Sequence, residues 1–285
     1  MGSWRSQKRA AGKRLFIGIV LIAAIAAVMG VAIWYQPGGD DDPAAAATNT
    51  DPSINTLGVG FQEASRTGDA LRGDQPFTIA VLGDATGNEQ TEWVYLMANA
   101  IAENYHRPVT VHDWSLPDNS YNRQNIVGEG GTNAPVVIWN GSASGRDAGY
   151  SIEHFETMAP GRPDLVIVNH GHNHTTPEAA VQGINNLLTL ATKSWTAPTP
   201  ALAVVLQNPR TDKSGANQKA KIAALRDDLD DRPDVEIIDV WSAFEKAPSL
   251  TPLVRPDGYH PSEQGEILWA DTTETVLGIP PSITP

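Results

Sequence analysis

The sequence contains no cysteine among its 285 residues. Disulfide bonds, thiolate metal sites and a cysteine nucleophile are therefore excluded. Basic residues are also scarce, with 20 against 33 acidic ones, and five of the 20 precede residue 15. The chain after residue 14 carries a net charge of −18, which argues against a nucleic acid partner because the phosphate backbone attracts basic surfaces.

Only one long apolar run occurs, at residues 15–35. Its first twenty residues are uncharged, and a helix of that length spans the roughly 30 Å core of a bilayer. Basic residues precede the run and Trp34-Tyr35 ends it, so we expect a single-pass signal anchor, with residues 1–14 in the cytoplasm and the remainder outside. A cleaved signal peptide, which would release a secreted protein, is the competing interpretation, but its apolar region is normally shorter, about 7–15 residues.

The composition after the anchor predicts a linker and one folded domain. Residues 36–75 are rich in Gly, Asp, Pro, Ala and Thr, which is typical of a flexible linker. Over residues 76–285, short apolar runs alternate with amphipathic stretches, which predicts a parallel sheet covered by helices on both faces. We expect a three-layer α/β/α sandwich with a mainly parallel, five-stranded sheet.

The expected strands and helices follow from the period of the apolar residues. Strands are expected at residues 77–83, 135–140, 164–170, 201–207 and 235–240. Helices are expected at residues 91–105, 148–158, 177–194, 216–230 and 262–277, the third capped by Thr176. The run at 109–114 is a further candidate for an edge strand, and the polar, Gly-rich residues 115–134 predict a long loop of the kind that covers sites.

The first expected strand runs into Gly83-Asp84-Ala85, the turn at which we expect the site. Open α/β folds bind ligands at the carboxyl ends of their strands, so the residue after Gly83-Asp84 should project into that site. Here it is Ala85, whose side chain has no functional group. The nearest hydroxyl belongs to Thr86, but the neighbouring residue in a tight turn usually points elsewhere.

Residues at other strand ends suit acyl transfer, which needs a nucleophile, an imidazole and a carboxylate that holds the imidazole. Asp257 and His260 lie three residues apart in an expected turn before the last helix, close enough to form that pair. Gly145 and Asn173 follow the second and third expected strands. Together with the backbone N–H of residue 85, they supply the donors that a developing oxyanion needs.

These motifs resemble those of the SGNH (GDSL-like) hydrolases. Members of that family carry Gly-Asp-Ser after the first strand, a Gly after the second, Gly-x-Asn after the third, and Asp-x-x-His before the last helix. The matching stretches, in family order, are Gly83-Asp84-Ala85, Gly145, Gly171-His172-Asn173 and Asp257-Gly258-Tyr259-His260. The resemblance covers residues 76–280. It implies a three-layer fold and a serine hydrolase of acyl or acetyl esters that needs no metal or organic cofactor.

The sequence departs from the family pattern at two positions. Ala85 stands where the family has its nucleophilic serine, and His174 stands where many members have aspartate. His170, His172 and His174 would share one side of an extended strand and would suit zinc, but Gly171 and Asn173 interrupt that strand. We therefore expect no metal site.

Three functional hypotheses follow. The first is a membrane-anchored, extracytoplasmic ester hydrolase for acyl or acetyl esters of lipids or cell-envelope glycans, whose serine is missing through natural loss or an introduced substitution. The second is a non-catalytic module that binds an acylated glycan or lipid. The third is a structural envelope protein that uses the domain only as a partner surface.

Overall fold

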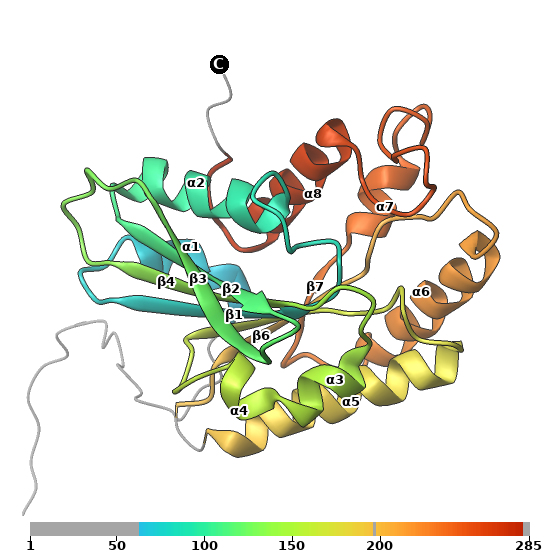
Figure 1. Cartoon of the computed structure of the whole chain (residues 1–285), viewed down its shortest axis with the longest axis horizontal. Helices are drawn as coiled ribbons and strands as arrows, with labels where there is room; N and C mark the ends of the chain where they lie inside the picture. Colours follow the sequence, from blue (N-terminus) through green and yellow to red (C-terminus); the bar gives the residue numbers. More distant parts are fainter. Residues whose placement is uncertain (1–62, 196–197, 282–285) are drawn as a thin grey trace, which may run out of the picture. The chain divides into compact units, whose positions relative to one another are not determined.

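The computed structural model of the chain describes residues 63–195 and 198–281 (Figure 1). The expected cytoplasmic tail at residues 1–14 and the expected anchor at residues 15–35 lie outside this part. None of the helices in residues 63–195 and 198–281 combines the length and hydropathy that crossing a membrane requires.

Seven strands form one sheet within the described residues, in the order β3-β2-β4-β1-β5-β6-β7. Neighbouring strands are parallel except β2 and β3, which are antiparallel. The strands are β1 Phe77–Gly83, β2 Val109–Ser115, β3 Ser120–Val127, β4 Val136–Ser142, β5 Leu165–Asn169, β6 Ala201–Val205 and β7 Glu236–Ile238. Since β1 lies between β4 and β5, the turn that follows it is flanked by the loops after both neighbours.

The sheet has more strands than the five that the sequence predicts. The candidate edge strand, β2, lies inside the sheet between β3 and β4. Strand β3 lies within residues 115–134, where the sequence predicts a loop. That prediction is wrong because β3 is an edge strand without a single fully buried residue, so its sequence lacks the apolar alternation that identifies a strand.

Helices cover both faces of the sheet, which confirms the predicted three layers (Figure 1). One face carries α2 Trp93–Tyr105, α7 Val240–Glu245 and α8 Glu263–Val276. The other carries α3 Ala148–Glu153, α4 Phe155–Met158, α5 Pro177–Ser194 and α6 Gly215–Leu229. Strands β5 and β6 are buried along their whole length between these layers, and their sequences are therefore continuously apolar.

The observed bounds of α5 agree with the predicted helix, whereas residues 148–158 and α7 differ from the prediction. Helix α5 begins as predicted, because the Thr176 hydroxyl accepts a hydrogen bond from the N–H of Ala179 and Pro177 follows in the first turn. Residues 148–158 form two helices instead of one, since the backbone leaves helical geometry at His154. Helix α7 has only six residues, which is too short to show a helical period in the sequence.

The folded unit begins before residue 76. A 3-10 helix, η1 (Ala64–Arg66), and helix α1 (Thr67–Leu71) precede β1, inside the predicted linker at residues 36–75. The N–H of Gly68 donates to the carbonyl of Leu277 at 2.9 Å. A Cβ at Gly68 would lie 1.8 Å from the carbonyl oxygen of Gly278, so the close approach requires glycine. The last residues of the predicted linker therefore belong to the domain.

Candidate active site

The turn after β1 is held by the side chain of Asp84, which is fully buried. Its Oδ1 accepts hydrogen bonds from the backbone N–H of Thr86 at 3.1 Å and from the Thr86 hydroxyl at 2.8 Å. Thr86 is itself fully buried, and its hydroxyl also accepts a bond from the Asn169 amide at 3.1 Å. Thr86 therefore supports the turn and is not placed as a substitute nucleophile, while Ala85 between them is 8% exposed.

Gln207 is a site residue that the sequence reasoning missed. Its Nε2 donates to Asp84 Oδ2 at 3.1 Å and to both oxygens of Asn169, and its Oε1 accepts the N–H of His172 at 2.7 Å. One buried amide thus joins the ends of β1, β5 and β6. Burial raises the pKa of Asp84, and the bonds from Gln207 and Thr86 and attraction to His260 oppose that rise. A polar Gln at the end of the apolar run 201–206 was the signal that could have identified it.

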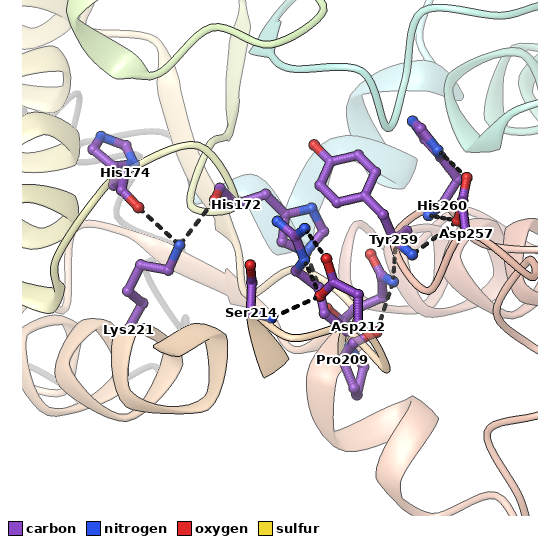
Figure 2. Close-up of polar contacts among 11 residues, drawn as sticks. His172, His174, Pro209, Asp212, Ser214, Lys221, Asp257, Tyr259 and His260 are labelled. Carbon is purple, nitrogen blue, oxygen red and sulfur yellow. Dashed lines mark hydrogen bonds and ion pairs between the residues drawn. The ribbon is translucent and has the colours of Figure 1, made fainter. Parts of the chain in front are cut away.

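Asp257 and His260 form a hydrogen-bonded pair in the loop before α8. His260 Nδ1 lies 2.8 Å from Asp257 Oδ2, and the N–H groups of Tyr259 and His260 donate to Oδ1 at 2.8 and 3.0 Å (Figure 2). Partial burial raises the pKa of Asp257, but these bonds outweigh it and leave the pKa below its ordinary value. The carboxylate therefore stays ionised and fixes the orientation of the imidazole.

Asn173 connects the loops after β4 and β5 to the turn after β1. Its Nδ2 donates to the carbonyl of Arg146 at 3.1 Å and to Asp84 Oδ2 at 3.3 Å. Gly145, directly before Arg146, has φ +72°, and nothing lies within 4 Å of the place where its Cβ would be. The structure thus brings Gly145, Asn173 and the turn containing Ala85 to one edge of the sheet, with open space beside Gly145.

The ring of Tyr259 lies between His172 and His260, with centroid distances of 4.8 and 4.4 Å (Figure 2). The guanidinium of Arg210 lies over the same ring at 4.5 Å. Burial raises the pKa of Tyr259, and the charge of Asp84 raises it further, while a hydrogen bond with Asn173 opposes the rise. Tyr259 therefore packs the His260 loop against the loops that follow β5 and β6.

The three alternating histidines are buried and have different surroundings. His170 Nε2 lies 2.9 Å from the hydroxyl of Ser151, and His172 Nε2 lies 3.1 Å from the carbonyl of Asn208. Burial lowers the pKa of His170 and of His172 to about 3, so both rings are neutral at physiological pH. His174 contacts His170 edge to face. Within the described residues, no three His, Cys, Asp or Glu side chains are grouped as metal ligands.

Lys221 on α6 is a second residue that the sequence reasoning missed. It is 3% exposed, and its Nζ donates to the carbonyls of His172 and His174 at 2.9 and 3.0 Å (Figure 2). Burial lowers the pKa of Lys221 to about 8. The ammonium holds the backbone on both sides of Asn173, so it positions the loop that carries the proposed oxyanion donor.

A family model for the GDSL-like lipase/acylhydrolases matches residues 55–272 of the chain. No match is found among curated proteins. The fold is similar to that of a lipase/acylhydrolase from Enterococcus faecalis, with a TM-score of 0.52 and 14% identity over 73% of this chain and 100% of the other.

Two further solved structures share the fold. An alpha/beta hydrolase enzyme from the metagenome of Lake Arreo gives a TM-score of 0.51 at 15% identity, over 73% of this chain and 98% of the other. A two-domain esterase active on acetylated mannans gives 0.52 at 14% identity, over 74% of this chain. The match covers 50% of that esterase.

Proposed function

Because the chain belongs to the GDSL-like lipase/acylhydrolase family, we propose that its folded unit is an ester hydrolase domain for acyl or acetyl esters. The proposed mechanism uses a serine nucleophile, His260 as general base and Asp257 as its partner, with Ala85 in the place of the serine. The observation that carries the proposal is the Asp257–His260 pair, 2.8 Å from Oδ2 to Nδ1, near the buried turn that contains Ala85.

Each remaining group has a task in acyl transfer. With a serine at position 85, its hydroxyl oxygen would attack the ester carbonyl and give its proton to Nε2 of His260, whose Nδ1 proton is held by Asp257. Nε2 would then return that proton to the leaving alcohol as the acyl-enzyme forms. The N–H groups of residues 85 and 145 donate to the oxyanion of the tetrahedral intermediate, and the Asn173 amide joins them when it exchanges its bond to the Arg146 carbonyl for one to the oxyanion. Water would then attack this acyl-enzyme with His260 again as base, releasing the acid and restoring the serine hydroxyl.

A non-catalytic ester-binding module is the second candidate function. Losing the nucleophile of a serine triad costs on the order of 10⁶ in kcat, so a chain with Ala85 would hold an ester without turning it over. The observation that favours this candidate is the complete hydrogen-bond network around Asp84 beside an inert Ala85.

Restoring the nucleophile tests the proposal. Ala85→Ser is expected to create hydrolysis of p-nitrophenyl acetate or butyrate, because only the attacking oxygen is missing. The change adds one atom at a strand-end turn and should alter the free energy of unfolding by no more than about 1 kcal/mol. Initial rates are compared for the unchanged chain, Ala85→Ser, and Ala85→Ser with His260→Ala, and only the second should be active.

A different result would favour the hypothesis of a binding module over that of an enzyme. If Ala85→Ser folds with an unchanged melting temperature yet hydrolyses neither short nor long acyl esters, the site has diverged beyond its nucleophile. Activity that survives His260→Ala would instead show that His260 is not the base.

We also propose that residues 15–35 anchor the folded unit outside the cytoplasm, with secretion after cleavage as the alternative. The support is the sequence: basic residues before an apolar run that ends in Trp34-Tyr35. Protease added to intact cells should digest the folded unit, and digestion only after permeabilisation would reverse the proposed orientation.

A further inference from the structure

A polar cavity of about 320 Å³ lies at the carboxyl ends of β2 and β4, next to the proposed site. Ser144 in its wall directly precedes Gly145, and Ser142, also in the wall, pairs in register with Gly83 on β1. Asn88, from the loop that begins with Ala85, forms another part of the wall. The cavity therefore borders both the proposed nucleophile turn and the proposed oxyanion glycine.

One wall of the cavity is built around Asp113, which is 3% exposed. The Tyr95 hydroxyl lies within hydrogen-bond distance of both carboxylate oxygens, 2.9 Å from Oδ1 and 2.8 Å from Oδ2. Oδ2 also accepts a hydrogen bond from the Asn125 amide at 2.8 Å. Nε of Arg123 donates to the same carboxylate at 3.0 Å. Among the described residues, the terminal nitrogens of Arg123 have no partner, and its side chain is 59% exposed. The Arg123 guanidinium is thus fixed through its Nε, and its two terminal nitrogens can donate hydrogen bonds to a ligand.

The remaining wall is neutral, and apart from Leu116, Pro117 and Trp114 its side chains are polar. Asn88, Asn122 and Ser144 bring amides and hydroxyls, and the buried Ser142 hydroxyl has no partner within the described residues. Trp114 adds an aromatic side chain whose indole N–H donates to the Tyr150 hydroxyl at 3.1 Å, which fixes its orientation. Because Asp113 balances Arg123, the cavity has no net charge from these groups.

We infer that this cavity binds the alcohol half of the ester and that this alcohol is a neutral carbohydrate. Sugar hydroxyls both donate and accept, as the amides and hydroxyls of the wall do, whereas an acyl chain needs a mainly apolar surface. The volume is at the small end of ligand sites, about 300–1,000 Å³, which suits a sugar ring better than a long chain. The inference rests on the proposed function, since it places the acyl carbonyl at Ala85, Gly145 and Asn173.

Binding to the full chain, with Ala85 retained so that no ligand is consumed, tests the inference. The chain is purified in mild detergent and titrated in a calorimeter with O-acetylated mannotriose, O-acetylated xylotriose and N-acetylated chitotriose, and with methyl butyrate as an ester without a sugar. We expect at least one acetylated trisaccharide to bind more tightly than methyl butyrate. Asn122→Ala and Arg123→Met should each weaken that binding by about tenfold, because each removes hydrogen bonds to the sugar.

Arg162→Met is the matched control. Arg162 lies 3.7 Å from Asp164, which precedes β5 at the opposite end of the sheet, and its side chain is 36% exposed. Its loss should leave trisaccharide binding unchanged. Asn122→Ala keeps the inference testable if Arg123→Met unfolds, because Asn122 does not contact the Asp113 carboxylate and donates instead to Asp118.

The inference fails if no trisaccharide binds, or if both cavity variants bind the sugar as the unchanged chain does. The experiments distinguish failure of this inference from failure of the proposed function. Hydrolysis of p-nitrophenyl acetate by Ala85→Ser without any sugar binding would refute the carbohydrate cavity alone. Sugar binding that depends on Asn122 and Arg123, with Ala85→Ser inactive on every ester, would refute the catalytic proposal and leave the cavity assignment standing.

Discussion

At the scale of single residues, the site is organised by buried side chains that cannot themselves react. Asp84 is surrounded by donors from Thr86, Asn173 and Gln207, which come from three different loops. A buried carboxylate without donors would be costly, so each donor contributes to holding its loop in place. Gln207 contributes most widely, because its amide also binds Asn169 and the N–H of His172.

Gln207→Leu is expected to lower the free energy of unfolding by about 1–3 kcal/mol, because it leaves buried partners without a hydrogen bond. Urea denaturation of the variant and the unchanged chain measures the difference. Gln90→Leu is the control: Gln90 is exposed and, among the described residues, hydrogen-bonds only Asn125, so its change should stay within about 0.5 kcal/mol. Equal losses in the two variants would contradict the special role of Gln207.

At the scale of elements, two buried glutamates join the helices that follow the proposed catalytic turns. Glu266 in α8 accepts the N–H of Trp93, the first residue of α2, at 3.0 Å. Glu92 precedes α2 and accepts the N–H of Glu89 at 2.9 Å. Each is 1% exposed, and the indoles of Trp93 and Trp269 stack beside them at 5.9 Å. The start of α2 is thereby tied to the helix that follows His260.

This arrangement predicts that the two glutamates contribute less to stability as the pH rises. Burial, then the charge of Glu92, raises the pKa of Glu266 to about 9, and burial raises that of Glu92 to about 7. Between their ordinary value of 4.5 and these values, these two carboxyls bind more protons in the folded chain than in the unfolded chain. The contribution of these two carboxyls to the free energy of unfolding should therefore fall from about pH 4.5 to about pH 9. Below about pH 6.5 the buried His170 and His172, whose pKa is lowered to about 3, contribute with the opposite sign, so the net fall is expected above that pH.

Glu266→Gln should weaken this pH dependence and raise the melting temperature at pH 8.5, because the amide stays neutral and still accepts the Trp93 N–H. Melting temperatures between pH 5 and pH 9 measure the slope. Glu263→Gln, an exposed change in the same turn of α8, should leave the slope as it is. A slope for Glu266→Gln as steep as that of the unchanged chain would show that the carboxyl does not control it.

At the scale of the whole molecule, the domain depends on residues before β1. Leu71 is 1% exposed, and the guanidinium of the fully buried Arg107 donates to the carbonyls of Leu71 and Gln75. A domain cut at residue 76, as the sequence suggests, would lose this apolar contact and both acceptors. It would leave a buried cation with fewer partners.

A chain of residues 76–285 is therefore expected to melt about 5–15 °C below one of residues 63–285, since burying one Leu contributes about 1.5–3 kcal/mol and the lost acceptors add to this. Calorimetry of the two fragments provides the comparison. Leu71→Ala in the longer fragment should reproduce part of the loss. Identical melting of the two fragments would place the domain boundary where the sequence suggests.

The sequence by itself determined the layered α/β architecture, most element positions, the strand-end motifs and the absence of a nucleophile at residue 85. These features are local, because a helical period, an apolar run or a Gly-Asp turn depends only on residues close together in the sequence. The Asp257–His260 pair belongs here as well, because three residues separate its members within a single turn.

Only the tertiary structure decided the seven-stranded sheet, the roles of Gln207 and Lys221, the paired glutamates and the polar cavity. Gln207 meets Asp84 across 123 positions of sequence, and Glu266 meets the start of α2 across 173. Such contacts do not produce a periodic pattern in the sequence, because each side chain hydrogen-bonds a buried group that lies far away along the chain. Strand β3 escaped prediction for the related reason that an edge strand takes its pairing from β2 and needs little apolar sequence of its own.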